Sequence, residues 1–432
     1  MDRLSLLPNE LLDDIFDLSH TLEHPLTRPL SKRLLPFFHR SFYRDIRLTT
    51  YEQLDRLCQT IYARSGLNSL VLNLRFELPD GEKAEDAIRR SEIEDPQIPT
   101  CEAILDLLCQ LENLQKLRLQ GSSRIARLFL DPPKERSFPF YNSLYVLQLA
   151  ASFTSHGDPF DFLLSSSLSH FRALKTLTLD VSRPASTIAS GAAAANAVQK
   201  VSNLSTTLLG LSLQGPLLAS QQVARIVESA PALAELALLL DVAYSFTGMR
   251  QLLEHVQQPQ RLRLLTLTGP SVDEVPADDL QPLQLFTKLR SITLDISVSL
   301  EDVVAALSKA PLHRITLGCF VDVKVDTLVK MVSGITMIRT LFELELNVIT
   351  DAARGSPVSR VLAKEEMEKL NLEDLDWELP EWTDDFSRDG FKEFLALAKK
   401  EEIQVTGDTV EALKIEDEWE EEMEYYRSVM ES

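Results

Sequence analysis

Glycine, cysteine and clustered histidine are all scarce in this chain of 432 residues. Only 14 residues are glycine, against a usual share of about 7%, and no Walker or dinucleotide fingerprint is present, which excludes the familiar phosphate-binding loops. The four cysteines lack disulfide or metal-motif spacing, as is typical of buried thiols in a reducing compartment. The seven histidines form no His-Glu-x-x-His motif. We therefore expect no enzyme, no metal and no cofactor.

Positive charge is also in short supply, with 44 Lys and Arg against 65 Asp and Glu and a net charge of −21. This excess of carboxylates argues against binding to nucleic acids or to anionic membranes, which rely on Lys and Arg. The most apolar window, residues 230–246, is interrupted by Glu235 and Asp241 and is unsuited to span a bilayer. The N-terminal residues carry no secretory signal pattern. We expect a soluble protein of the cytoplasm or nucleus.

The chain does have a repeated motif, Leu-x-x-Leu-x-Leu or a close variant of it. Eleven copies are found, and a weaker one follows at Ile403 and Val405. After a first interval of 47 residues, successive copies lie 23 to 34 residues apart. The copies start at Leu67, Leu114, Leu144, Leu174, Leu208, Leu233, Leu262, Leu289, Leu312, Leu341 and Leu372. Such regularity indicates one structural unit stacked many times.

Each copy alternates apolar and other residues over its last four positions, as a strand buried on one face does. Between copies the apolar spacing is helical, for example at Val303, Val304 and Leu307. One unit is therefore strand, turn, helix and turn over about 30 residues. These stretches resemble leucine-rich repeats, which implies an α/β solenoid over residues 51–379, with a curved parallel sheet and outer helices. The alternative is an ordinary α/β domain with leucine-rich strands.

Residues 1–50 do not match the repeat. They begin Leu-Pro-x-Glu-Leu-Leu at Leu7, continue with an apolar pair at Ile15 and Phe16, and have Leu-Ser-Lys at Leu30. This string resembles an F-box, a small all-α segment, and implies docking onto a Skp-family adaptor, and through it a cullin, of an SCF-type ubiquitin ligase. The residues implied to bind the adaptor are Leu7, Pro8, Glu10, Leu11, Leu12, Ile15, Phe16, Leu30 and Leu34. The alternative is a segment that only caps the first repeat.

The third and fifth residues of each copy point away from the core, onto the concave face of the sheet. In the first copy they are Ser69 and Val71, and the second copy places the basic residues Lys116 and Arg118 there, which we expect to bind the substrate. The last two copies place four carboxylates there, those of Glu343, Glu345, Asp374 and Asp376. Because aligned like charges repel, these carboxylates favour the hypothesis that the face captures a basic segment of a protein substrate. A solvated charged face without a partner is the alternative.

Acidic residues are concentrated at the C-terminus, where residues 363–432 hold 24 acidic and 8 basic side chains, a net charge of −16. We expect residues 380–432 to form a cap on the last repeat, with Trp419, Tyr425 and Tyr426 docked against it. A solvated acidic interaction tail is the alternative. In either case this region carries most of the net charge of the chain.

Together, these patterns favour a substrate-recognition subunit of an SCF-type ubiquitin ligase. In this hypothesis the F-box-like segment binds the adaptor, and the repeats hold a protein substrate near the ubiquitin-loaded partner. The first alternative is a non-catalytic repeat scaffold for protein interactions with no ligase role. An enzyme of unknown type is the second alternative.

Overall fold

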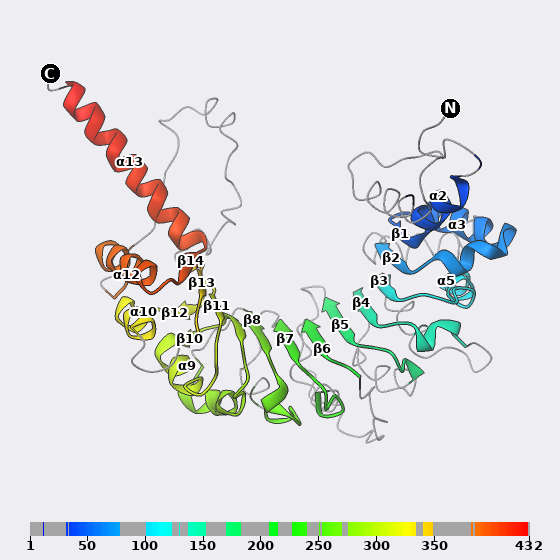
Figure 1. Cartoon of the computed structure of the whole chain (residues 1–432), viewed down its shortest axis with the longest axis horizontal. Coiled ribbons are helices and arrows are strands. Elements are labelled where there is room, and N and C mark those ends of the chain that lie inside the picture. The colour runs from blue at the N-terminus through cyan, green and yellow to red at the C-terminus, as the bar shows by residue number, and fades with distance from the viewer. Residues whose placement is uncertain are drawn as a thin grey trace. The chain divides into compact units, whose positions relative to one another are not determined.

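The computed structural model describes residues 12, 32, 34–77, 101–122, 129, 137–152, 170–182, 207–214, 227–239, 250, 253–269, 275–333, 340–348, 382 and 385–430. The chain divides into two compact units, Met1–Ala232 and Leu233–Ser432. Within each unit, short parallel strands lie side by side in a sheet (Figure 1). No helix among the described residues is long and apolar enough to cross a membrane.

The described part of the first unit contains the parallel strands β1 to β6, which pair in chain order. The strands are β1 (Asp45–Leu48), β2 (Asn73–Glu77), β3 (Lys116–Ser122), β4 (Val146–Ser152), β5 (Thr176–Ser182) and β6 (Gly210–Gln214). The helices are α2 (Leu35–Arg44), α3 (Tyr51–Ala63) and α5 (Cys101–Leu108), with the 3-10 turns η2 (Ser65–Leu70) and η3 (Pro139–Asn142). Described helical segments thus lie between β1 and β2, between β2 and β3, and between β3 and β4.

The described part of the second unit has the parallel strand order β7-β8-β9-β11-β13-β14 and a separate pair, β10 with β12. The strands are β7 (Glu235–Leu239), β8 (Leu264–Thr268), β9 (Ser291–Asp295), β10 (Val298–Ser299), β11 (Arg314–Leu317), β12 (Val321–Asp322), β13 (Glu343–Leu346) and β14 (Gln404–Thr406). The helical segments are η7 (Pro259–Arg261), η8 (Ala277–Leu285), α9 (Leu300–Ala306), α10 (Val325–Val332), α12 (Arg388–Lys400) and α13 (Asp408–Met430).

The repeated leucines form the core of each unit. One register position on β3 to β6 is held by the buried side chains of Leu117, Leu147, Leu177 and Leu211. The same position on β7, β8, β9, β11 and β13 is held by Leu236, Leu265, Ile292, Ile315 and Leu344. Burial of each such side chain contributes about 2 kcal/mol, and a slip of one residue would turn the whole set toward water. The leucine spacing therefore fixes the register, and the predicted leucine-rich-repeat fold is confirmed.

A second regularity lies just before each strand, where one carbonyl accepts two N–H groups from the next repeat. The carbonyl of Tyr145, for example, accepts from Lys175 and Thr176, both at 2.9 Å. The same arrangement recurs at the carbonyls of Leu72, Gln115, Lys175, Ala234, Arg263, Arg290 and His313. The hydroxyl of Ser143 adds a bond of 2.9 Å to the carbonyl of Leu114. Because buried backbone groups must be paired, these bonds join each repeat to the next.

The structure corrects the position of the first repeat. The predicted copy at Leu67 falls on η2 instead of a strand, and the strand is β2. The motif begins at Val71, four residues later, and its inward residues are Leu74 and Phe76, all three of them buried. Ser69 and Val71 are therefore not the outward residues of this repeat. An additional strand, β1, lies within residues 1–50 and pairs in parallel with β2.

The last repeat also differs from the prediction. The weak copy at Ile403 and Val405 forms β14, which pairs directly with β13. The other edge of β13 is occupied by β11. The copy predicted at Leu372 lies outside the described residues and does not provide the neighbour of β13.

Candidate interaction surfaces

A row of arginines crosses the outward face of the first three strands. Arg47 on β1, Arg75 on β2 and Arg118 on β3 are register partners. Register partners on adjacent strands lie about 5 Å apart and point to the same face. Lys116 precedes Arg118 by two residues and shares this face. We call these four side chains the basic row.

One carboxylate lies within the basic row. Glu77, the last residue of β2, accepts a hydrogen bond from Arg47 Nε at 2.6 Å, and its other oxygen lies 3.8 Å from Arg118 Nη1. The Glu77 side chain is only 16% exposed. Arg75, between the two arginines in register, is exposed, and its guanidinium forms no hydrogen bond or ion pair with a described residue. Positive charge therefore remains in excess along the row.

The leucine motif predicts only half of the basic row. It places Lys116 and Arg118 on the outward face, where the structure has them. It does not include Arg47 and Arg75. The copy that holds Arg75 begins with valine and ends with phenylalanine, so it does not match a motif defined by leucine. The signal that would find Arg75 is the wider apolar pattern Val-x-x-Leu-x-Phe, which starts at Val71.

The acidic residues predicted late along the sheet are partly neutralised. Arg314 on β11 donates to Glu345 Oε2 at 2.9 Å and lies 3.6 Å from Glu343 Oε1. The hydrogen bond from Arg314, with further ones from Asn347 and Thr316, lowers the pKa of Glu345. This carboxylate is therefore both ionised at neutral pH and paired within the chain.

The predicted patch of four aligned and unpaired carboxylates needs correction. The register partners of Glu343 and Glu345 on β14 are Gln404 and Thr406, and Arg314 lies on the other side. The two remaining members of the predicted patch, both outside the described residues, are Asp374 and Asp376. The repulsion between aligned carboxylates, which favoured a basic substrate segment, is thus removed for the described pair.

Two of the residues implied to bind the adaptor are described, Leu12 and Leu34. Both are fully buried, and they form one cluster with Phe38 of α2, against which Phe37 packs. In this structure Leu12 and Leu34 thus pack within the chain, and adaptor binding through them stays a prediction. The other implied residues, which lie outside the described ones, are Leu7, Pro8, Glu10, Leu11, Ile15, Phe16 and Leu30.

The start of α13 is fixed to the end of β13. Gly407, with a φ of 107°, turns the chain from β14 into α13, a conformation that favours glycine. The side-chain oxygen of Asn347 accepts the backbone N–H of Asp408 at 2.9 Å. The hydroxyl of Thr409 accepts the backbone N–H of Val348 at 3.0 Å. These bonds satisfy donors that would otherwise lie unpaired at the junction.

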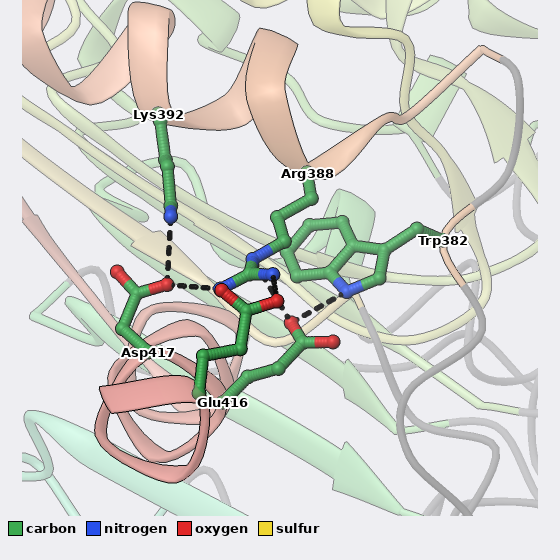
Figure 2. A network of polar contacts seen from close by, with 6 residues as sticks. Trp382, Arg388, Lys392, Glu416 and Asp417 are labelled. Carbon is green, nitrogen blue, oxygen red and sulfur yellow. Dashed lines mark hydrogen bonds and ion pairs between the residues drawn. The ribbon is translucent and has the colours of Figure 1, made fainter. Parts of the chain in front are cut away.

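A polar network joins α12 to α13, and we call it the clamp (Figure 2). Arg388, the first residue of α12, forms ion pairs with the carboxylates of Glu416, Asp417 and Glu420. One turn further on α12, Lys392 contacts Asp417 at 2.7 Å. The indole N–H of Trp382 donates to Glu416 at 2.9 Å. The clamp thus holds one face of the acidic helix against α12.

Aromatic packing supports the same cap. The ring of Trp382 stacks on Phe386, with centroids 6.0 Å apart, and Phe391 is buried beside them. Tyr425, predicted to dock on the last repeat, is instead exposed, and the later part of α13 extends away from the strands (Figure 1). The side chains of Trp419 and Tyr426 lie outside the description. The docked part of α13 is therefore its beginning.

Two observations bear on metal and thiol chemistry in the described part of the chain. No group of three or more His, Cys, Asp or Glu that could hold a metal ion occurs among those residues. Burial, with a smaller contribution from Asp55, raises the pKa of the Cys58 thiol to about 11. This thiol is protonated at neutral pH, and Cys58 is not a nucleophile there.

The chain was compared with known proteins. No protein-family model matches it, and no curated protein matches it. Among solved structures it is similar to a chain in the crystal structure of the Rad7 and Elc1 complex in yeast, with 12% identity and a TM-score of 0.39, over 79% of this chain and 88% of that one. It is also similar to internalin C2 from Listeria monocytogenes strain 4b F2365, with 14% identity and a TM-score of 0.24, over 54% of this chain and 91% of that one.

Proposed function

We propose that this protein is a substrate-recognition subunit of an SCF-type ubiquitin ligase. Its F-box-like segment binds a Skp-family adaptor, and through it a cullin, while its repeats bind a protein substrate. The chain forms no bonds itself; it holds a substrate lysine near the ubiquitin-loaded partner and so raises the local concentration of the reactants. This role places the protein in the cytoplasm or nucleus.

The observation that carries the proposal is the buried cluster of Leu12, Leu34 and Phe38. Leu12 belongs to the first half of the F-box-like string and Leu34 to the second, so the two halves share one apolar core. The described members of this cluster come from helical or turn residues, and none comes from β1 or β2. Because α2 also contacts β1 and η2, the segment covers the first repeat as well, and the cluster supports the proposal by joining the two halves of the F-box-like string in one core.

The leucine-rich repeats support the second half of the proposal. Side chains alternate along each strand, so every repeat that buries two core residues presents others on the outward face. Stacked repeats give a long surface whose chemistry changes from strand to strand without disturbing the core. Such a surface suits recognition of another protein.

Adaptor binding is tested by co-expression of the full chain with a Skp-family adaptor. The variant carrying Leu7→Ala and Pro8→Ala should lose adaptor co-purification while its thermal unfolding stays unchanged. The matched control carries Leu285→Ala and Pro276→Ala, the same exchanges at two exposed positions of the second unit, and should keep the adaptor. Failure of the unaltered chain to bind any Skp-family adaptor would contradict the ligase role and favour the non-catalytic scaffold.

A further inference from the structure

We propose that the basic row, formed by Arg47, Arg75, Lys116 and Arg118, binds a carboxylate-rich segment of a protein partner. The inference that the row binds such a segment depends only on the contacts of the row. The identification of the partner as a ligase substrate depends in addition on the function proposed above. Two carboxylates share the outward face of β1 to β3 with these four cations, those of Asp45 and Glu77. This local excess of positive charge occurs in a chain of net charge −21.

The row is arranged so that its charges repel one another. Arg47, Arg75 and Arg118 are direct register partners on three successive parallel strands, and like charges placed opposite each other destabilise a sheet. Lys116 adds a further cation, which lies over the ring of Tyr145 at 5.8 Å from its centroid. An anionic segment laid across the strands would convert this repulsion into attraction with every member of the row.

Glu77 shows which ligand chemistry the row accepts. Its two carboxylate oxygens face two different arginines, Arg47 at 2.6 Å and Arg118 at 3.8 Å. The row therefore already holds a carboxylate between guanidinium groups in the geometry of the free chain. Further carboxylates from a partner would meet the same groups along the row.

Arg75 is the residue on which a partner would depend most. It lies between Arg47 and Arg118 in register, is exposed, and its guanidinium has no hydrogen bond or ion pair with a described residue. A guanidinium offers five N–H donors in a planar fork, and this fork matches a carboxylate with two parallel hydrogen bonds. Arg75 can thus bind a partner carboxylate without first breaking a bond inside the protein.

The neighbouring strands favour a peptide over a nucleic acid. Along the register that contains Arg118, the next outward residues are Gln148, Thr178 and Ser212. These uncharged side chains continue the surface with hydrogen-bonding groups and without further cations. A nucleic acid gains affinity from many phosphate contacts, and the row ends after three strands, so a short acidic peptide fits its extent better.

The probe is a set of short fluorescein-labelled peptides with glutamates one helical turn apart or at alternate residues. A helical turn of about 5.4 Å is close to the strand spacing of about 5 Å, and alternate extended residues lie about 7 Å apart. The same peptides with glutamine in place of glutamate are the ligand controls. The full chain should bind at least one acidic peptide saturably in fluorescence anisotropy, and salt should weaken the binding.

The protein variants are Arg75→Glu and a matched control, Arg263→Glu. Arg263 is an exposed arginine before β8, and its side chain also has no hydrogen bond or ion pair with a described residue. Loss of one charge-assisted contact should weaken binding by Arg75→Glu about tenfold to a hundredfold. Arg263→Glu, which changes the net charge equally, should leave the affinity within about twofold of the original. Arg75→Lys should fall between them, because it keeps the charge and loses the planar fork.

Several results would overturn the inference. They are equal affinities of the Arg75→Glu and Arg263→Glu chains, equal binding of glutamine peptides, no saturable binding of any acidic peptide, and stronger binding of single-stranded nucleic acid than of peptide. Self-association abolished by Arg75→Glu would assign the row to a second copy of this chain and also overturn it. Adaptor co-purification of the Arg75→Glu chain should be unchanged, so failure of the row and failure of the ligase role are told apart.

Discussion

Replacing Arg388 with methionine should release the start of α13 from α12. The guanidinium contacts Glu416, Asp417 and Glu420, which are 15%, 41% and 65% exposed. Exposed pairs contribute little because water screens them, so most of the cost arises at Glu416, which would keep only its bond from Trp382. The contact between Arg388 Nε and Glu416 is an ion pair of 3.4 Å without hydrogen-bond geometry. Leaving this mostly buried carboxylate without its cation costs about 2 kcal/mol, or roughly 30-fold in the docking equilibrium.

Hydrogen exchange measures this change directly, because the exchange rate of an amide is proportional to the fraction of time for which its segment is open. The amides of residues 408–420 should exchange roughly 30-fold faster in the Arg388→Met chain, and those of β3 to β5 should not change. The matched control is Arg56→Met on α3, where the ion pair with Glu52 is mostly exposed and its loss should cost no more than about 0.5 kcal/mol. Unchanged protection of α13, or an equal local effect at Arg56, would refute the assignment of the clamp.

Acid should release the same helix, because hydrogen bonds from Lys392 and Arg388 lower the pKa of Asp417, and those from Arg388 lower the pKa of Glu420. The stabilisation by these carboxylates is complete above their unfolded-state pKa values of about 4, and it is lost as the pH falls through their lower folded-state pKa values. Tryptophan fluorescence should therefore change as the pH falls below about 4. A fluorescence signal that stays constant in acid would argue against this release of the helix. Gly318→Ala should cost about 1–3 kcal/mol in urea unfolding, because a Cβ there would overlap the Asp295 carboxylate, whereas Gly66→Ala, with open space around it, should be nearly neutral; equal effects would contradict this packing.

The repeat is the part of the fold that sequence predicts best. A leucine buried at a fixed period leaves a signal in every copy, and Leu147, Leu177 and Leu265 lie in register where the motif places them. The strength of this signal comes from energetics, since each copy loses its core contacts when the register slips. Prediction therefore succeeds for the copies that start at Leu114 to Leu341, all of which form strands of the sheet.

The same reasoning explains where prediction fails. In the first repeats the inward positions are filled by Val71, Leu74 and Phe76, and a motif defined by leucine alone moves to Leu67. An apolar side chain of any kind satisfies the core, so the physical requirement is wider than the motif. A copy that starts at Leu67 does not place Arg75 on the outward face, so the basic row predicted from the leucine motif is incomplete.

Side-chain pairing between distant segments was beyond sequence reasoning for a different reason. In the sequence, the copy that holds Glu343 and Glu345 is followed by a predicted copy that holds Asp374 and Asp376. If these two copies formed adjacent strands, their carboxylates would repel one another. In the sheet, β13 lies between β11 and β14, so the neighbour that matters is Arg314, which pairs with both. Whether aligned charges repel or attract depends on the residues of the adjacent strands. The order of the strands depends in turn on which segments form strands.

The two ends of the chain differ in whether their cations are paired with carboxylates of the same chain. At the C-terminal cap, Arg388 and Lys392 are matched by carboxylates of α13, and at β11 to β13 Arg314 is matched by two glutamates. On β1 to β3 the cations outnumber the carboxylates, and Arg75 has no described partner. Pairing within the chain stabilises its own fold, whereas an aligned set of cations without enough internal partners lowers stability. An external anion that binds these cations would remove their repulsion, which gives a physical reason for the arrangement.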